Sequence, residues 1–448
     1  MKKLAKVLSL VLLTAILVSA LAGCGGDKSA EQTADTAMAS GTSGAREVSI
    51  TYWGWMPYNE IMNSQMVPEF NKKYPNIKVE VQIMDWGAYW DKLSAEMAAG
   101  EGPDVFAMNP DNFPKFQENM APLDELANKV IGSDWKTRFV DAFLKDAYMG
   151  GTELKMFPYS FSGQWFIYYN KTFLSELGTK APANYDELKA MTQAIAAKDK
   201  DVLPIAFGGK EALTDAYFYT GLVNAIQPGI VQEAGKGNAK FTDEPFVKGM
   251  ESFKKLFADG VLNKTVLGID PQPGADDLFK NRKAATFLSG AWLAGGYLGG
   301  TQLGGTPIEN DEIGVVAMPN INGGKNMVLG SVDFAYGINN NSKEKEAALT
   351  FAGDMVLGQP AKIFADNTMP VPAAKDIKVD MNSIKTDEAK ATFGNFEKSY
   401  SEGLAGPRST FIPAVDNKIG EVIQAVLQDK LEIKAALEQV QQAYEQNK

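Results

Sequence analysis

Three tryptophans stand where a predicted strand gives way to a turn that contains glycine. The stretch TYWGW at residues 51–55 places Trp53 and Trp55 on either side of a glycine, and Trp292 follows a serine and a glycine after another predicted strand. An indole offers a flat apolar face on which the C–H face of a pyranose ring packs. Core packing is the commoner role of a tryptophan. We favour a sugar site for Trp55 and Trp292, whereas Trp53 fits equally well as the residue that closes the buried face of its strand.

Polar side chains that can bind sugar hydroxyls follow other predicted strands. Asn109 and Asp111 come directly after the buried strand pattern DVFAM, and they either contact a ligand or cap the next helix. Gln164 and Trp165 open the pattern QWFIYY, either as site residues or as an ordinary start of a strand.

Two charged residues complete the candidate site. Asp333 lies in the apolar run GSVDFAYGI, where an unpaired carboxylate is costly. It therefore needs a protein partner or a ligand hydroxyl, and we favour the ligand. Arg408, in GPRSTF, either reaches the same site or lies on the surface. The aromatic group of residues 86, 89 and 90 has helical spacing, which indicates packing.

Composition excludes several kinds of chemistry. The chain of 448 residues contains no histidine and one cysteine, so histidine-based catalysis, a disulfide framework and the usual zinc sites are absent. Its formal net charge is −11, and it has no strong basic cluster for nucleic acid. We expect no cofactor and no metal. A carboxylate-based enzyme or a binding protein remains.

The first residues have the pattern of a lipoprotein signal peptide. A basic start with three lysines leads into an apolar stretch, and Leu21-Ala22-Gly23-Cys24 resembles a bacterial lipobox. We expect cleavage after residue 23, a lipid on Cys24 that anchors the protein to the outer face of the cell membrane, and a flexible linker over 24–46.

From residue 47 onward, strand and helix patterns alternate. Alternating strands at 47–53 and 77–83, a helix at 86–97 and a short buried strand at 104–108 form a β-α-β series. A second series runs from residue 164 to residue 288. Such series predict α/β lobes, each with a mixed or parallel sheet flanked by helices, in which ligands bind beyond the carboxyl ends of the strands.

Several longer stretches, taken in this order behind a lipobox, carry a family resemblance. The chain resembles the extracellular solute-binding proteins of bacterial ABC importers, of the carbohydrate-binding type related to maltose-binding protein. The stretches that carry it are ITYWGW at 50–55, PEFNKKYPNIKVEV at 68–81, WDKLSAEMAAGEGPDVFAM at 90–108, WFIYYNKTFLSELG at 165–178, PANYDEL at 182–188, FKNRKAATFLSGAW at 279–292, GVVAMPN at 314–320 and VLGSVDFAYGINNNSKEKEAALTF at 328–351.

The resemblance implies a two-lobed fold of the type II periplasmic-binding-protein class, with a ligand cleft between the lobes. The amino-terminal lobe is expected to comprise 47–158 plus 319–370, and the carboxy-terminal lobe 159–318 plus 371–448. It also implies a monomer that is not an enzyme, that closes on a sugar and that delivers it to the permease of an ABC transporter.

Two other functions stay open at this point. A secreted carbohydrate-active enzyme needs only two carboxylates, which this chain has near its strand ends. The same fold would also accept a polyamine, a peptide or another solute, and the acidic composition leaves such ligands open.

Overall fold

The computed structural model describes residues 46–55, 61–402, 404–405 and 408–448, which belong to one compact unit. The predicted signal peptide, Cys24 and the linker as far as residue 45 lie outside the described residues. In the described part of the chain, no helix is long and apolar enough to cross a membrane.

Three parallel strands and one antiparallel strand form the sheet of the amino-terminal part. Strands β1 (Val48–Trp55), β2 (Ile77–Met84) and β3 (Val105–Met108) are parallel, and β8 (Leu329–Ile338) pairs with β3 in the antiparallel direction. The alternating pattern of β1 sends successive side chains to opposite faces. One face packs on α14 (Lys345–Leu357) and the other on α3 (Trp86–Ala98).

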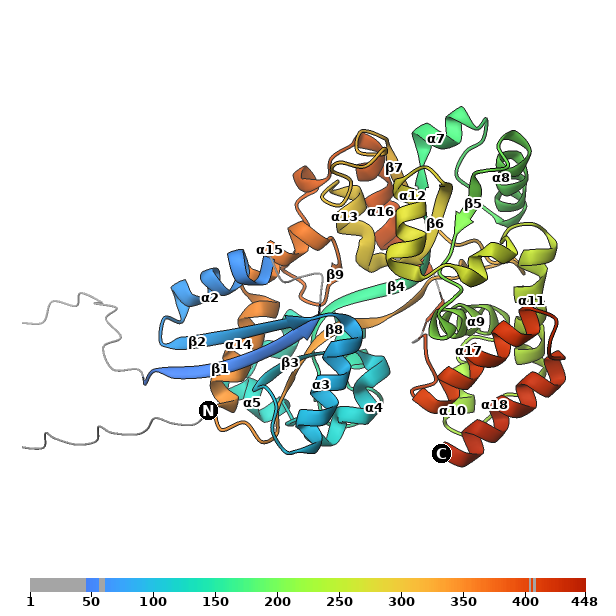
Figure 1. Ribbon diagram of the computed structural model, residues 1–448. Coiled ribbons are helices and arrows are strands. Elements are labelled where there is room, and N and C mark those ends of the chain that lie inside the picture. Colours follow the sequence, from blue (N-terminus) through green and yellow to red (C-terminus); the bar gives the residue numbers. More distant parts are fainter. Residues whose placement is uncertain (1–45, 56–60, 403, 406–407) are drawn as a thin grey trace, which may run out of the picture. The chain divides into compact units, whose positions relative to one another are not determined.

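A single long strand continues this sheet into the second half of the molecule (Figure 1). Strand β4 (Phe157–Asn170) pairs with β8 and with β9 (Val371–Pro372) along its first half. Along its second half it pairs with β6 (Ala284–Gly290) and β7 (Ile313–Ala317), and β5 (Leu203–Ala206) lies parallel to β6. The short β10 (Leu404–Ala405) pairs with β8.

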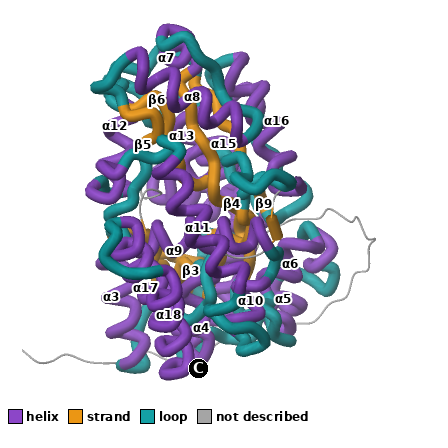
Figure 2. The backbone as a smooth tube through the Cα atoms, turned by 90° about the vertical axis from the view of Figure 1, so that its right-hand side faces the viewer, coloured by secondary structure: helices purple, strands orange, loops and turns teal. Residues whose placement is uncertain are grey.

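Helices flank the strands on both sides (Figure 2). Those not yet given are α2 (Val67–Lys73), α4 (Phe113–Phe116), α5 (Asp124–Val130), α6 (Asp141–Ala147), α7 (Lys171–Glu176), α8 (Tyr185–Lys198), α9 (Ala212–Ile226), α10 (Ile230–Gly235), α11 (Glu244–Ala258), α12 (Asp276–Lys280), α13 (Ala294–Leu298), α15 (Gln359–Thr368), α16 (Asp387–Glu402), α17 (Pro413–Leu427) and α18 (Ile433–Asn447). The predicted α/β architecture is confirmed.

Separate hydrophobic clusters define two lobes. One cluster combines β1, β2, β3 and the first half of β4 with most of the buried residues from 332 to 377. Two others cover the faces of the second half of β4, where Trp165 and Ile167 point into one cluster and Phe166 and Tyr168 into the other. Because β4 is buried on both faces there, its sequence is continuously apolar and does not alternate.

The chain changes lobe where its residues change cluster. It crosses within β4 and returns between Val328 and Val332, at the start of β8. Met369 then packs in the second lobe, Ala373, Ala374 and Ile377 pack again in the first, and Ile384 packs in the second. Ile321 packs in the second lobe, so the return crossing lies after the boundary expected at 318/319. We therefore propose the first two positions as lobe boundaries in place of 158/159 and 318/319, and a last crossing that extends over residues 369–384 and includes the expected 370/371.

Candidate ligand-binding site

The candidate residues of the first lobe gather where β3 ends. Its last residue, Met108, pairs with Ala335 of β8, which continues past it, while the register of β1 with β3 places Trp55, the last residue of β1, level with Met108. Trp55 and Phe334 of β8 meet at this edge, with ring centroids 5.2 Å apart. The carboxyl edge of a parallel sheet, next to a strand of opposite direction, is where α/β proteins bind ligands.

Trp55 is the last residue of β1 and belongs to an aromatic cluster. Because β1 stays paired with β2 as far as Met84, Trp55 lies in the strand and not in a loop. Its half-buried ring contacts three rings of α3, at centroid distances of 5.1 Å to Trp86, 5.4 Å to Tyr89 and 5.5 Å to Trp90. This packing fixes the orientation of the indole from one side.

Trp53 lies on the same face of β1, one pleat earlier. The ammonium group of Lys92 stands 4.2 Å from the centroid of its ring, and the ring packs against the core of the first lobe. A cation over an aromatic face is a favourable contact. Trp53 thus has packing partners of its own, and we leave it out of the proposed site.

Asn109 and Asp111 take different roles. The side-chain oxygen of Asn109 accepts a hydrogen bond from the Asn112 backbone N–H at 3.2 Å, so this buried residue caps the turn at Pro110–Asn112. Capping was one of the two roles that its position predicted. Asp111 instead points to the second lobe, where its Oδ2 accepts hydrogen bonds from Arg408.

Arg408 joins the two lobes. Its Nε and Nη2 lie 2.8 and 2.7 Å from Asp111 Oδ2, and its Nη1 lies 4.0 Å from Asp333 Oδ1. The guanidinium carbon is 4.9 Å from the ring centroid of Tyr217 on α9 and 5.6 Å from that of Trp292. The side chains of Arg408 and Asp111 are only 18% and 10% exposed, so this ion pair is largely withdrawn from water. Arg408 therefore lies at the interface of the lobes and not on the surface.

Burial and neighbouring charges tune the ionisation of this group. Burial opposes the charge of Arg408, but the carboxylates of Asp111 and Asp333 outweigh it and raise the arginine pKa. Burial raises the pKa of Asp333, and Asp111 adds to this rise while Arg408 opposes it. Burial also raises the pKa of Asp416, at the start of α17, to about 7, although Thr410 donates a backbone hydrogen bond to it. The carboxyl group of Asp416 can therefore change protonation near neutral pH.

Trp292 lies in a short turn that follows β6, in the second lobe. Its half-buried ring packs against the core of that lobe on one side and faces Arg408. The ring lies directly over Gly290, where a Cβ would stand 1.9 Å from the indole Cζ3. Only glycine permits this approach, so Gly290 determines where the indole lies.

Gln164 and Trp165 lie inside the second lobe. Trp165 is 2% exposed, and its ring packs against Phe207 and Phe218 in the core. A ligand would have no access to it, and we leave Trp165 out of the proposed site. Gln164 is 5% exposed, and its Oε1 has no hydrogen-bond partner among the described residues. It pairs with Leu329 of β8 and Gly290 of β6, next to the crossing between the lobes.

Sequence reasoning missed two residues that the structure brings to this group. Tyr217 lies in the middle of the sequence of α9, and its ring stacks on Arg408. Nothing in the sequence pattern of this helix indicates that Tyr217 belongs to a site. Trp86 contacts Trp55 and is 45% exposed, although its helical spacing predicted packing. Trp86 precedes the buried residues of the helix by one turn, and this position at the helix start could have indicated that its ring is exposed.

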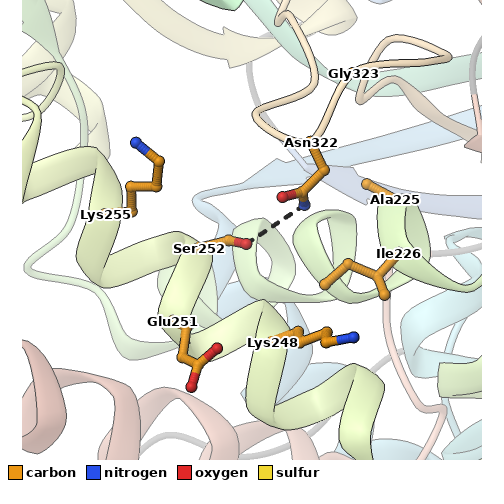
Figure 3. Close-up of a pocket in the computed structure, with 8 residues that line it drawn as sticks. All are labelled: Ala225, Ile226, Lys248, Glu251, Ser252, Lys255, Asn322 and Gly323. Atoms are coloured by element: carbon orange, nitrogen blue, oxygen red, sulfur yellow. Dashed lines mark hydrogen bonds between the residues drawn. The ribbon is translucent and has the colours of Figure 1, made fainter.

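Two depressions on the second lobe lie away from these residues. One, of about 560 Å³, is lined by Ala225, Ile226, Lys248, Glu251, Ser252, Lys255, Asn322 and Gly323 (Figure 3). Its two lysines already pair with carboxylates outside the lining, and no lining residue is aromatic. The other, of about 700 Å³, adjoins β7 and contains several asparagines. The first has no aromatic ring, and the second, whose lining includes Tyr185 and Asp186, contains none of the candidate residues.

No metal site competes with this interpretation in the part of the chain that the structure describes. No group of three or more histidine, cysteine, aspartate or glutamate side chains is placed there to hold an ion.

Comparison with known proteins defines the class. The family described as bacterial extracellular solute-binding protein matches residues 59–358, so the chain belongs to that family. It is similar to the multiple sugar-binding protein of Streptococcus mutans, with 25% identity over 84% of each chain. It is also similar to the galactooligosaccharide-binding protein of Bacillus subtilis, with 23% identity over 98% of this chain and 96% of the relative.

Solved structures show the same fold. The maltose-bound MalE3 of T. maritima superposes with a TM-score of 0.73 at 20% identity, over 89% of this chain and 99% of that one. The two-lobed, type II periplasmic-binding-protein fold expected from the sequence is thereby confirmed.

Proposed function

We propose that this protein captures a sugar or an oligosaccharide between its two lobes and delivers it to the permease of an ABC transporter. The observation that carries the proposal is the buried Asp111–Arg408 pair, which joins the lobes beside Trp292. Asp333, which lies 4.0 Å from Arg408, is followed in the sequence by Phe334, whose ring contacts Trp55. The ion pair is thereby connected to the aromatic cluster around Trp55.

The chemistry of this group suits an uncharged, polyhydroxylated ligand. Indole faces accept the C–H faces of sugar rings, while carboxylates and a guanidinium bind hydroxyl groups. One arginine between two carboxylates leaves no large excess of either charge, which disfavours a polyamine as the ligand. The names of the two relatives, multiple sugar-binding and galactooligosaccharide-binding protein, support the same class.

The mechanism of delivery follows from the two lobes. A ligand that touches Trp55 in one lobe and Trp292 in the other stabilises the closed arrangement by its greater affinity for that arrangement. The permease then recognises the outer surface of the closed lobes. The protein acts as a monomer, as a binding protein and not as an enzyme, and it contacts no nucleic acid.

We also propose that a lipid on Cys24 holds the protein at the outer face of the cell membrane. The support is the lipobox pattern that ends at this cysteine. Labelling of expressing cells with radioactive palmitate should mark the wild type and leave Cys24→Ser unlabelled. Equal labelling of both would contradict the anchor.

The test of ligand capture is a thermal-shift screen of the purified chain against mono- and oligosaccharides, polyamines and short peptides. A ligand that binds the folded state raises the melting temperature by mass action. We expect neutral sugars to do so, and we expect chromatography to recover them intact. A shift with polyamines or peptides alone, or cleavage of the sugar, would overturn the proposal.

A further inference from the structure

Trp86 extends the aromatic cluster of the first lobe into solvent. It is the first residue of α3, and the helix buries Tyr89, Trp90, Leu93 and Met97 at the spacing of one helical face. Trp86 continues this apolar stripe by one turn toward the carboxyl end of β1. There the sheet no longer covers it, and the indole is 45% exposed.

An isolated exposed apolar side chain needs no explanation, but Trp86 is not isolated. Its ring stands edge-on to Trp55, at 5.1 Å and 83°, and edge-on to Trp90, at 5.3 Å and 84°. The edge contacts hold the indole in place while much of its surface stays open to solvent. A fixed, open indole next to the candidate site has the properties of a stacking platform.

The open platform lies at one end of a continuous series of contacts. Trp86 contacts Trp55, Trp55 contacts Phe334, and the adjacent Asp333 lies 4.0 Å from Arg408, which faces Trp292. One sugar ring can stack on only one of two platforms that are separated by these groups. Linked rings can occupy both.

We propose that Trp86 is the outer platform of an extended site and that it sets a preference for oligosaccharides over monosaccharides. This inference rests on the proposed function, since it assumes that the ligand is a sugar. In this arrangement Trp292 and Arg408 bind one end of the ligand, and a later ring of the same ligand stacks on Trp86.

The test is titration calorimetry with glucose, maltose, maltotriose and maltotetraose, and with matching xylose and N-acetylglucosamine series. The proteins are the wild type, Trp86→Ala and Trp86→Phe. A matched control is Met381→Ala, because Met381 is 42% exposed and lies in a different part of the fold.

We expect Trp86→Ala to leave the affinity for the shortest sugar that binds within about twofold of wild type. It should weaken the longer members by about three- to tenfold, the usual value of one aromatic contact. Trp86→Phe should restore part of this loss, and Met381→Ala should change nothing.

Two results would overturn the inference, and they are distinguishable. If sugars bind but Trp86→Ala weakens all lengths equally, or none, Trp86 is not an outer platform although the proposed function stands. If no sugar of any length binds the wild type, the proposed function fails first, and the inference fails with it.

Discussion

The buried ion pair between the lobes gives the sharpest prediction. Replacing Arg408 by glutamine removes the cation and leaves two carboxylates, Asp111 and Asp333, within the same poorly hydrated region. Replacing Asp111 by asparagine should destabilise the fold less. The guanidinium of Arg408 then still has the carboxylate of Asp333 at 4.0 Å and the rings of Tyr217 and Trp292 beside it. The two substitutions should therefore have unequal effects.

The expected magnitudes follow from the burial of the pair. Removing one partner of a buried pair costs about 3 kcal/mol, which we expect for Arg408→Gln at pH 7. We expect about 1–2 kcal/mol for Asp111→Asn, the usual cost of leaving a buried group without its partner. The double variant should lose less than the two single variants together, with a coupling energy of at least about 1.5 kcal/mol.

The assay is urea denaturation, followed by circular dichroism, of the four proteins of this cycle at pH 7 and pH 5. Burial already raises the pKa of Asp333, and loss of the arginine, which opposes this rise, should make the carboxyl easier to protonate as the pH falls from 7 to 5. The loss in Arg408→Gln should then be smaller at pH 5 than at pH 7.

A surface pair of the same length serves as the control. Lys248 and Glu244 are 2.7 Å apart, as are Arg408 Nη2 and Asp111 Oδ2, but their side chains are 54% and 75% exposed. Their cycle should show no measurable coupling. Additive effects at Arg408 and Asp111, or a larger loss in Asp111→Asn than in Arg408→Gln, would refute the reasoning.

Three further predictions concern single positions. In Gly290→Ala the new Cβ would overlap the ring of Trp292 and displace it. Sugar affinity should therefore fall roughly tenfold, while the far-ultraviolet circular dichroism stays unchanged. An unchanged affinity in calorimetry would show that the indole does not contact the ligand. Trp55→Ala should weaken sugar binding by a similar factor, and equal affinity of variant and wild type would remove Trp55 from the site. Burial raises the pKa of Asp215 from 3.8 to about 8, so the folded chain keeps a proton that the unfolded chain gives up, and stability falls as pH rises between these values. The difference in melting temperature between Asp215→Asn and wild type should therefore shift in favour of the variant from pH 5 to pH 8. The control Asp141→Asn, which changes a 93% exposed side chain, should show no such trend. If the two variants have parallel pH profiles, Asp215 does not have a raised pKa.

Periodicity was enough to predict most elements of the fold. The strand expected at 77–83 and the helix expected at 86–97 lie at 77–84 and 86–98, within one residue of their predicted bounds. Strand β4 was harder, since burial on both faces removes the alternation. Its first half, from Phe157 to Gly163, was therefore not recognised as part of the same strand.

The candidate site was predictable by residue type but not by partner. Arg408 and Asp111 are 297 positions apart, and no local pattern reports a contact at that separation. Trp165 lies in a strand and is buried in the core. Trp292 follows a strand and is half-buried at the surface of its lobe. Which side of a strand faces a core depends on the neighbouring elements, and the sequence of the strand alone does not contain that information.

The central claim is that a sugar binds between the lobes and touches both of them. Titration calorimetry of the wild type with the best sugar of the thermal-shift screen, repeated with Trp55→Ala and Trp292→Ala, tests it most directly. We predict one sugar per chain for the wild type, and a loss of affinity in each variant, because each tryptophan belongs to a different lobe. Binding that is unaffected by either substitution would place the ligand elsewhere and contradict the account.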